Sequence, residues 1–159
     1  MFHVGEKVVY PMHGAGIIDS IEDKDIFGSI KKCYIIKMLI GDIKVIIPVC
    51  DIDSIGVRLI ASCDYDKVME ILKGPCVKMD ERWNVRYRLN EQTMRIGEIC
   101  HLAEIVNYLA DRDKKNKLST WEKRMYCTAY DILISELSLI KDLTMSDMKL
   151  IVDEMLNLC

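Results

Sequence analysis

One short segment near the middle of the chain combines a tryptophan with four arginines. Between positions 82 and 95 these arginines are accompanied by a single acidic residue, Glu91, although the 159-residue chain has a net charge of −3. Arginine binds phosphate through bidentate, charge-assisted hydrogen bonds. An exposed tryptophan can stack on a splayed base or wedge into a base step. The candidate nucleic-acid contacts are therefore Arg82, Trp83, Arg86, Tyr87 and Arg88.

The helical wheel of this segment leaves its burial open. At 100° per residue, Trp83, Tyr87 and Met94 fall within about 40° of each other. A surface helix normally has one apolar stripe, but here a second stripe lies roughly opposite the first. The helix is therefore either sandwiched, with Trp83 and Tyr87 in the core and the arginines solvated, or it presents one stripe to a partner. The second stripe consists of Val85, Leu89 and Ile96.

Catalytic and metal-binding patterns are scarce in the rest of the chain. The three histidines lack an HExxH pattern, and Gly14 and Gly16 stand outside any Walker or GxGxxG pattern. Asp51 and Asp53 have a spacing that suits a metal loop, but no further ligands follow, so we expect strand-end or turn residues. The seven cysteines form no CxxC pair, and we expect mostly reduced, buried thiols. We predict no catalytic residue, no metal site and no cofactor.

The composition limits where such a protein can act. Half of the residues are hydrophobic, which excludes disorder as the main state. A free-standing, non-specific nucleic-acid binder is usually basic, so a DNA role here requires a local patch or help from another protein. The N-terminus has no signal-peptide pattern, and no apolar run approaches the about 18 residues of a membrane span. We expect a cytoplasmic protein with neither a membrane nor a small-molecule partner.

The first 60 residues have the pattern of short strands. Apolar and β-branched runs alternate with Pro and Gly punctuation, which predicts a small barrel or a strongly curved sheet. We expect turns at 12–16 and 41–42, and a hairpin connection over 22–28. The predicted strands are Val8–Tyr10, Ile17–Ile21, Cys33–Ile40 and Ile43–Ile47.

From residue 64 the pattern changes to that of helices. Ser119 and Glu122 form a capping box, in which each side chain bonds the other residue's backbone, and the polar run 111–117 is expected to be a connection. The fold class is therefore α+β, with a β module at 1–60, an all-α helical bundle at 64–159 and a short linker through which the modules touch. The predicted helices are 64–73, 80–95, 96–111, 119–139 and 148–158.

Three phrases of the sequence, in order, resemble bacterial transcription regulators of the CarD type. VGEKVVYPMHG at positions 4–14 is similar to the family phrase V-G-x-x-V-V-Y-P-x-H-G. RWNVRYRLN at 82–90 is similar to W-x-x-R-Y-x-x-N, and LSTWEKRM at 118–125 is similar to L-S-x-x-E-K-R-M. The resemblance covers essentially the whole chain.

This resemblance implies a function without enzymatic activity. It implies a Tudor-like N-terminal module that docks on the β subunit of RNA polymerase, and a helical module that contacts promoter DNA at the upstream edge of the bubble. The family tryptophan that matches Trp83 wedges into the minor groove there and stabilises the open complex. Arg86 matches a family arginine, and Arg88 lies where the family tends to be basic. The alternative is an adaptor on polymerase whose helical module binds another protein through the Trp83 stripe rather than DNA.

The resemblance also points to docking residues on the β module. Relatives contact polymerase through basic residues on the β-hairpins, and Lys24 matches one of these places. A second place, in the strand before Pro48, holds Ile46 here, with Lys44 close by in the sequence. Lys24, Lys44 and Ile46 are therefore the candidate polymerase contacts.

Overall fold

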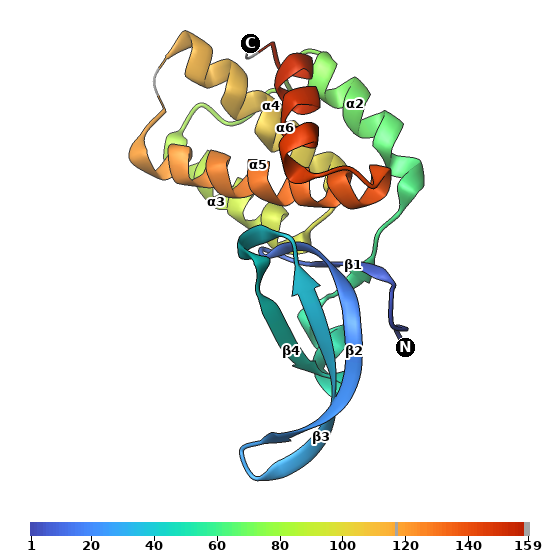
Figure 1. Ribbon diagram of the computed structural model, residues 1–159. Helices are drawn as coiled ribbons and strands as arrows, with labels where there is room; N and C mark the ends of the chain where they lie inside the picture. Colours follow the sequence, from blue (N-terminus) through green and yellow to red (C-terminus); the bar gives the residue numbers. More distant parts are fainter. Residues whose placement is uncertain (117, 158–159) are drawn as a thin grey trace.

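The chain folds into an antiparallel sheet followed by a group of helices, which confirms the predicted α+β class (Figure 1). The structure is a computed structural model that describes residues 1–116 and 118–157. Five strands are arranged in the order β4-β3-β2-β1-β5. Their bounds are β1 Lys7–Tyr10, β2 Gly14–Ile26, β3 Ser29–Met38, β4 Lys44–Pro48 and β5 Arg58–Leu59.

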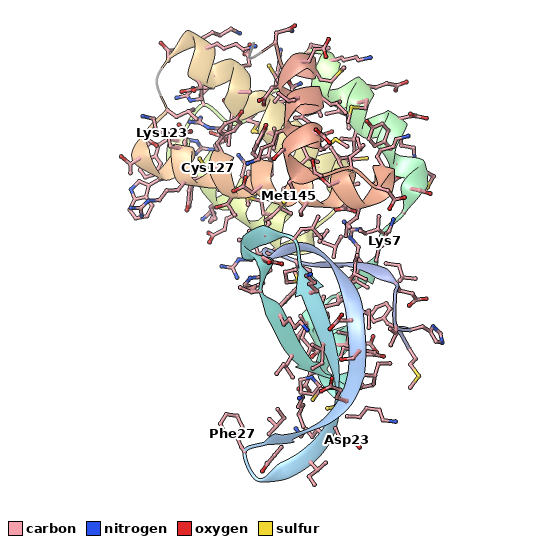
Figure 2. The ribbon with its side chains drawn as sticks, viewed as in Figure 1. Lys7, Asp23, Phe27, Lys123, Cys127 and Met145 are labelled. Atoms are coloured by element: carbon pink, nitrogen blue, oxygen red, sulfur yellow. The ribbon has the colours of Figure 1, made fainter. Side chains whose placement is uncertain are left out.

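The β2–β3 hairpin is much longer than the sequence pattern predicts. The expected connection over 22–28 is wrong, because strand pairing continues down to Ile26 opposite Ser29. The turn consists of Phe27 and Gly28, which both have positive φ, 50° and 83°. Two such residues make the turn type whose twist matches that of antiparallel strands. The hairpin extends away from the helices, with Phe27 at its tip (Figures 1 and 2).

Short helical turns connect β3 to β4 and β4 to β5, and a tight turn connects β1 to β2. Gly41, with φ 76°, lies in the turn Ile40–Asp42 between β3 and β4, close to the expected turn at 41–42. The expected turn at 12–16 ends earlier, because β2 begins at Gly14. Asp51 and Asp53 lie in helical turns after β4, in η2 Val49–Asp51 and α1 Ile52–Ile55, which agrees with the turn alternative.

Five longer helices make up the second half of the chain. The expected connection over 111–117 is wrong for 111–115, because these residues belong to the helix Ile99–Lys115. Basic side chains near the C-terminus of that helix favour it through the helix dipole. Lys117 and the end of the helix expected over 148–158 lie outside the described residues. After η3 Ser62–Asp64 the helices are α2 Tyr65–Lys73, α3 Trp83–Ile96, α4 Ile99–Lys115, α5 Thr120–Lys141 and α6 Met145–Met155.

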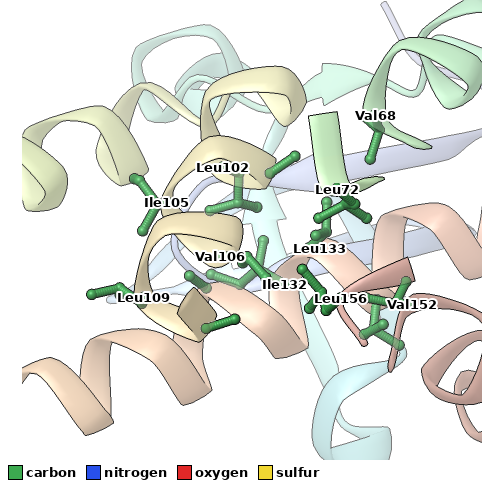
Figure 3. Close-up of a cluster of buried hydrophobic side chains, with 14 of the residues drawn as sticks. Val68, Leu72, Leu102, Ile105, Val106, Leu109, Ile132, Leu133, Val152 and Leu156 are labelled. Atoms are coloured by element: carbon green, nitrogen blue, oxygen red, sulfur yellow. The ribbon is translucent and has the colours of Figure 1, made fainter. Parts of the chain in front are cut away.

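The hydrophobic core of the helical half lies between α2, α4, α5 and α6 (Figure 3). Leu72, Leu102, Leu133 and Val152, one from each helix, are all buried in it. The sheet has a core of its own around Tyr34 and the neighbouring aliphatic residues. Each half can therefore bury apolar surface without the other.

The two halves are nevertheless joined by a hydrogen-bonded junction. Arg58 of β5 donates to both carboxylate oxygens of Glu136 on α5, at 2.9 Å each, and to the carbonyl of Gly97 at 2.7 Å. The Ala15 amide donates to Ser135 Oγ at 2.9 Å. Lys7 donates to the Leu139 carbonyl at 2.7 Å, at the edge of the junction (Figure 2). The two modules therefore contact each other, as the short linker predicts.

Candidate nucleic-acid interface

Trp83 is the first residue of α3, and its side chain lies on the surface. It is 55% exposed, so the interpretation of Trp83 as a core aromatic is wrong. The buried side of α3 consists of Arg86, Asn90 and Met94, which follow one another at intervals of four residues. Trp83 lies on this same side, but it is at the N-terminus of the helix, where neighbouring parts of the protein no longer cover the side chain.

The second apolar stripe of α3 faces solvent. Leu89 is 48% exposed and Ile96 is 72% exposed, so the helix is not sandwiched between two layers. Tyr87 is half-buried and packs against the core of the helices. The helix therefore presents both the exposed Trp83 and the outer stripe to the surroundings.

Arg86 lies inside the molecule, which corrects the expectation that it contacts DNA directly. Its side chain is 2% exposed. Nε donates to Glu122 Oε1 at 3.1 Å, and Nη1 donates to the carbonyls of Asp80 and Glu81 at 2.9 and 3.2 Å. The guanidinium also lies 5.8 Å from the ring centre of Tyr108. With its hydrogen bonds used internally, Arg86 is a positioning residue for the start of α3.

Glu122 completes this buried network at the start of α5. Its amide donates to Ser119 Oγ at 3.2 Å, as the capping box predicts. Its carboxylate does not return to the Ser119 backbone as expected, because it binds Arg86 and, at 3.4 Å, Nε of Arg112. Burial raises the pKa of Glu122, but the two guanidinium groups outweigh burial and hold this pKa below its ordinary value. The ion pair therefore fixes the N-termini of α3 and α5 relative to each other.

The remaining predicted arginines are exposed, but they do not share one face. Arg82 directly precedes Trp83 and binds Asp80 at 2.9 and 3.0 Å. Hydrogen bonds from the side chain and backbone of Arg82 lower the pKa of the Asp80 carboxyl to about 2. Arg88 is exposed about 140° around the helix from Trp83. Of the predicted arginines, the structure brings only Arg82 and the buried Arg86 close to Trp83.

A second exposed tryptophan, Trp121, lies beside Trp83 and was missed in the sequence pattern. It is also 55% exposed, and both side chains line one hollow of about 460 Å³ at the starts of α3 and α5. Its signal in the sequence was its place in the first turn after the Ser119 cap, where a helix end is often uncovered. We call this feature the tryptophan hollow; its other lining residues are Arg112, Leu118, Ser119 and Glu122.

The candidate docking residues share the outer face of the sheet. Lys24, Lys44 and Ile46 pair with residues 31, 37 and 35 of β3. These positions alternate with Tyr34 and Ile36 of the sheet core, although Ile35 is itself buried beneath this side. Opposed residues of antiparallel strands point to the same side. The structure therefore brings the three residues onto one surface, away from the sheet core.

Acidic neighbours moderate the charge of this outer face. Lys24 lies 2.8 Å from Glu22, and Lys44 lies 2.9 Å from Asp19. The hydrogen bond to Asp19 raises the pKa of Lys44. Ile46 is exposed between them on the edge strand β4. The face therefore combines lysines in ion pairs with an exposed aliphatic residue.

The described part of the chain contains neither a metal-binding cluster nor a membrane-spanning helix. Over residues 1–116 and 118–157 there is no group of three or more side chains that could hold a metal ion. Within the same ranges no helix is both long enough and apolar enough to cross a membrane.

Comparison with known proteins gives matches to both halves of the chain. The model of the CarD-like/TRCF RID domain matches residues 2–60, and the model of the CarD C-terminal domain matches residues 67–153. The protein described as "Putative transcription factor YdeB" from Bacillus subtilis (strain 168) is 37% identical over 150 residues, which cover 94% of this chain and 98% of that protein. The chain therefore belongs to the CarD family of transcription regulators.

Proposed function

We propose that this protein docks on the β subunit of RNA polymerase through its sheet and stabilises the promoter open complex through Trp83. Membership of the CarD family supports a transcription regulator that interacts with RNA polymerase. The observation that carries the DNA contact is Trp83 itself, a large aromatic side chain exposed at a helix start that a buried ion pair holds in place. Such a side chain can enter the minor groove or stack where the strands separate. Its action at the polymerase places it in the cytoplasm.

The net charge of the chain fits a regulator that acts only when bound to polymerase. A chain of charge −3 makes few phosphate contacts and binds free DNA weakly. Docking raises the effective concentration of the helical module at the promoter, so that weak contacts suffice. A wedge that fits the separated strands better than the closed duplex shifts the equilibrium towards the open state.

The structure suggests different roles for the five predicted DNA-contact residues. Trp83 contacts the bases, while the exposed Arg82 and Arg88 contact phosphates on either side. Arg86 and Tyr87 do not need to touch DNA, because one is buried and the other packs against the helical core. Their role is to keep the first turn of α3 rigid, which lowers the entropy lost when Trp83 binds.

Replacing Trp83 with alanine is expected to shorten the lifetime of the open complex by roughly tenfold, because stacking on a base contributes about 1–3 kcal/mol. The lifetime is measured by competitor challenge of open complexes formed with purified polymerase holoenzyme and the full-length protein. Leu150→Ala is the matched control, since Leu150 is an exposed apolar residue on α6. Circular dichroism checks that both variants are folded.

An unchanged lifetime with folded Trp83→Ala protein would rule out the wedge. Crosslinking to forked promoter DNA in the presence of polymerase distinguishes the DNA-binding function from the adaptor alternative. If the Trp83 region crosslinks to a protein subunit and never to DNA, the helical module binds protein instead.

For docking, we expect Lys24→Glu to weaken binding of the polymerase β subunit several-fold, since the change reverses a charge on the outer face of the sheet. The affinity of each variant for the isolated β-subunit lobe is measured by pull-down or by titration onto the immobilised lobe. Lys149→Glu on α6 makes the same charge change at a lysine of similar side-chain exposure, 46% against 40%. Equal binding by both variants would move the interface elsewhere.

A further inference from the structure

We propose that the tryptophan hollow binds one unpaired base of the promoter DNA, with Trp121 as a second stacking surface beside Trp83. This inference rests on the proposed function, because it takes the helical module to be at the edge of the bubble. It goes further in naming a site for a single flipped or splayed nucleotide. Trp83 then acts as one wall of a pocket rather than as an isolated wedge.

The first support is the placement of the two indoles. Trp83 begins α3 and Trp121 lies in the first turn of α5, and both are more than half exposed while lining the same hollow. Single exposed apolar residues are common, but neighbouring ones rimmed by polar residues often mark an interaction site. Stacking on aromatic side chains is the general way in which proteins hold unpaired bases.

The size of the hollow agrees with this occupant. Its volume of about 460 Å³ is within the ~300–1,000 Å³ of pockets that hold small organic groups. Leu118 is buried in its wall, while Ser119 lies at its surface. Two indoles and Leu118 beside polar and charged groups suit the flat face and polar edge of a base.

The charges around the hollow favour a nucleotide over a peptide. Arg112 lines the hollow, and the Arg124 guanidinium lies 5.5 Å from the ring centre of Trp121. The acidic residue in the wall is Glu122, whose carboxylate is neutralised by Arg86 and Arg112. Aromatic surfaces together with arginines match the base and the phosphate of one nucleotide. Lys123 also lies at this end of α5 (Figure 2).

Trp121 is a feature of this chain rather than of the family phrase. It occupies the second open position of L-S-x-x-E-K-R-M, directly before Glu122. The phrase thus specifies the cap and the buried ion pair but leaves the residue type at 121 free.

The test uses polymerase holoenzyme, the full-length protein and promoter DNA with 2-aminopurine placed at one unpaired position at a time beside the upstream fork. Stacking against an indole quenches this base. We expect Trp121→Ala to relieve the quenching at one position and to shorten the open-complex lifetime by roughly five- to tenfold. Trp121→Phe should keep most of both effects, and Leu150→Ala should keep all of them. Trp121→Glu, which repels phosphate, serves as a second loss variant if the alanine variant is unstable.

The possible outcomes separate the two proposals. If Trp83→Ala changes quenching and lifetime while the Trp121 variants change neither, the hollow is not a base site but the wedge stands. If no variant at either tryptophan has an effect, both proposals fail. If Trp121→Ala weakens binding to polymerase in the absence of DNA, the occupant is a protein, and the inference is overturned.

Discussion

Replacing Arg86 with alanine is expected to lower the free energy of unfolding by about 3 kcal/mol, the lower end of the range for breaking one side of a buried ion pair. The change leaves the Glu122 carboxylate buried with Arg112 as its remaining cation, 3.4 Å away. It also removes the donor that binds the carbonyls of Asp80 and Glu81. Urea denaturation followed by circular dichroism measures the loss.

The dependence of this loss on pH identifies its cause. In the wild type the pKa of Glu122 is below its ordinary value of 4.5, so the stabilisation is complete above pH 4.5 and is lost as pH falls through the lower, folded-state pKa. In Arg86→Ala only Arg112 opposes burial, so we expect the pKa of Glu122 to be higher than in the wild type, and falling pH to cost the variant less stability. The difference in stability between the two proteins should therefore narrow below about pH 4.5.

Arg82→Ala provides the control for Arg86→Ala. Arg82 lies four residues earlier, and its ion pair with Asp80 is on the surface, so its loss should change stability little. Equal destabilisation by the two changes, or a difference that stays constant with pH, would contradict the positioning role of Arg86.

Replacing Arg58 with alanine is expected to destabilise the junction of the two modules by about 3 kcal/mol. Glu136 is 1% exposed and would keep a buried charge without its cation, and the Gly97 carbonyl would lose a donor. Burial already raises the pKa of Glu136, against the lowering effect of Arg58. We expect the single urea transition to broaden or split, with faster amide exchange in the sheet and in the adjoining part of α5.

The double variant Arg58→Ala/Glu136→Gln tests this explanation. Glutamine removes the unpaired charge, so the double variant should recover part of the stability that Arg58→Ala loses. If the double variant is the less stable of the two, the buried charge is not the cause. If a single sharp transition persists in Arg58→Ala, the junction does not couple the modules as described.

The sequence pattern predicted the fold class and all five longer helices because they depend on local periodicity. Its errors concern polar stretches that are typical of loops but continue a strand or a helix. The polar residues 22–25 belong to a strand because the opposite strand continues beside them. Residues 111–115 stay helical because nothing interrupts α4 there, although their polar character is typical of a loop.

The candidate site was predicted only in part, because exposure and burial also depend on residues that are distant in the sequence. The wheel placed Trp83 and the buried residues of α3 on one side, but exposure depends on where the neighbouring helices end. The burial of Arg86 depends on Glu122, which is 36 residues away in the sequence. Trp121 could have been noticed as a large aromatic residue in the first turn of a capped helix. Its position beside Trp83 follows only from the packing of α3 against α5.

The junction between the modules also sets how far the sheet lies from the start of α3. Arg58 binds α5 and the end of α3 together, and the Ala15–Ser135 bond joins the sheet to α5 a second time. If the sheet docks on polymerase as proposed, these bonds set the distance from the docking face to Trp83. On the proposed function, the base step that Trp83 meets is set by this length and by where polymerase melts the DNA, so that one protein can serve promoters of unrelated sequence.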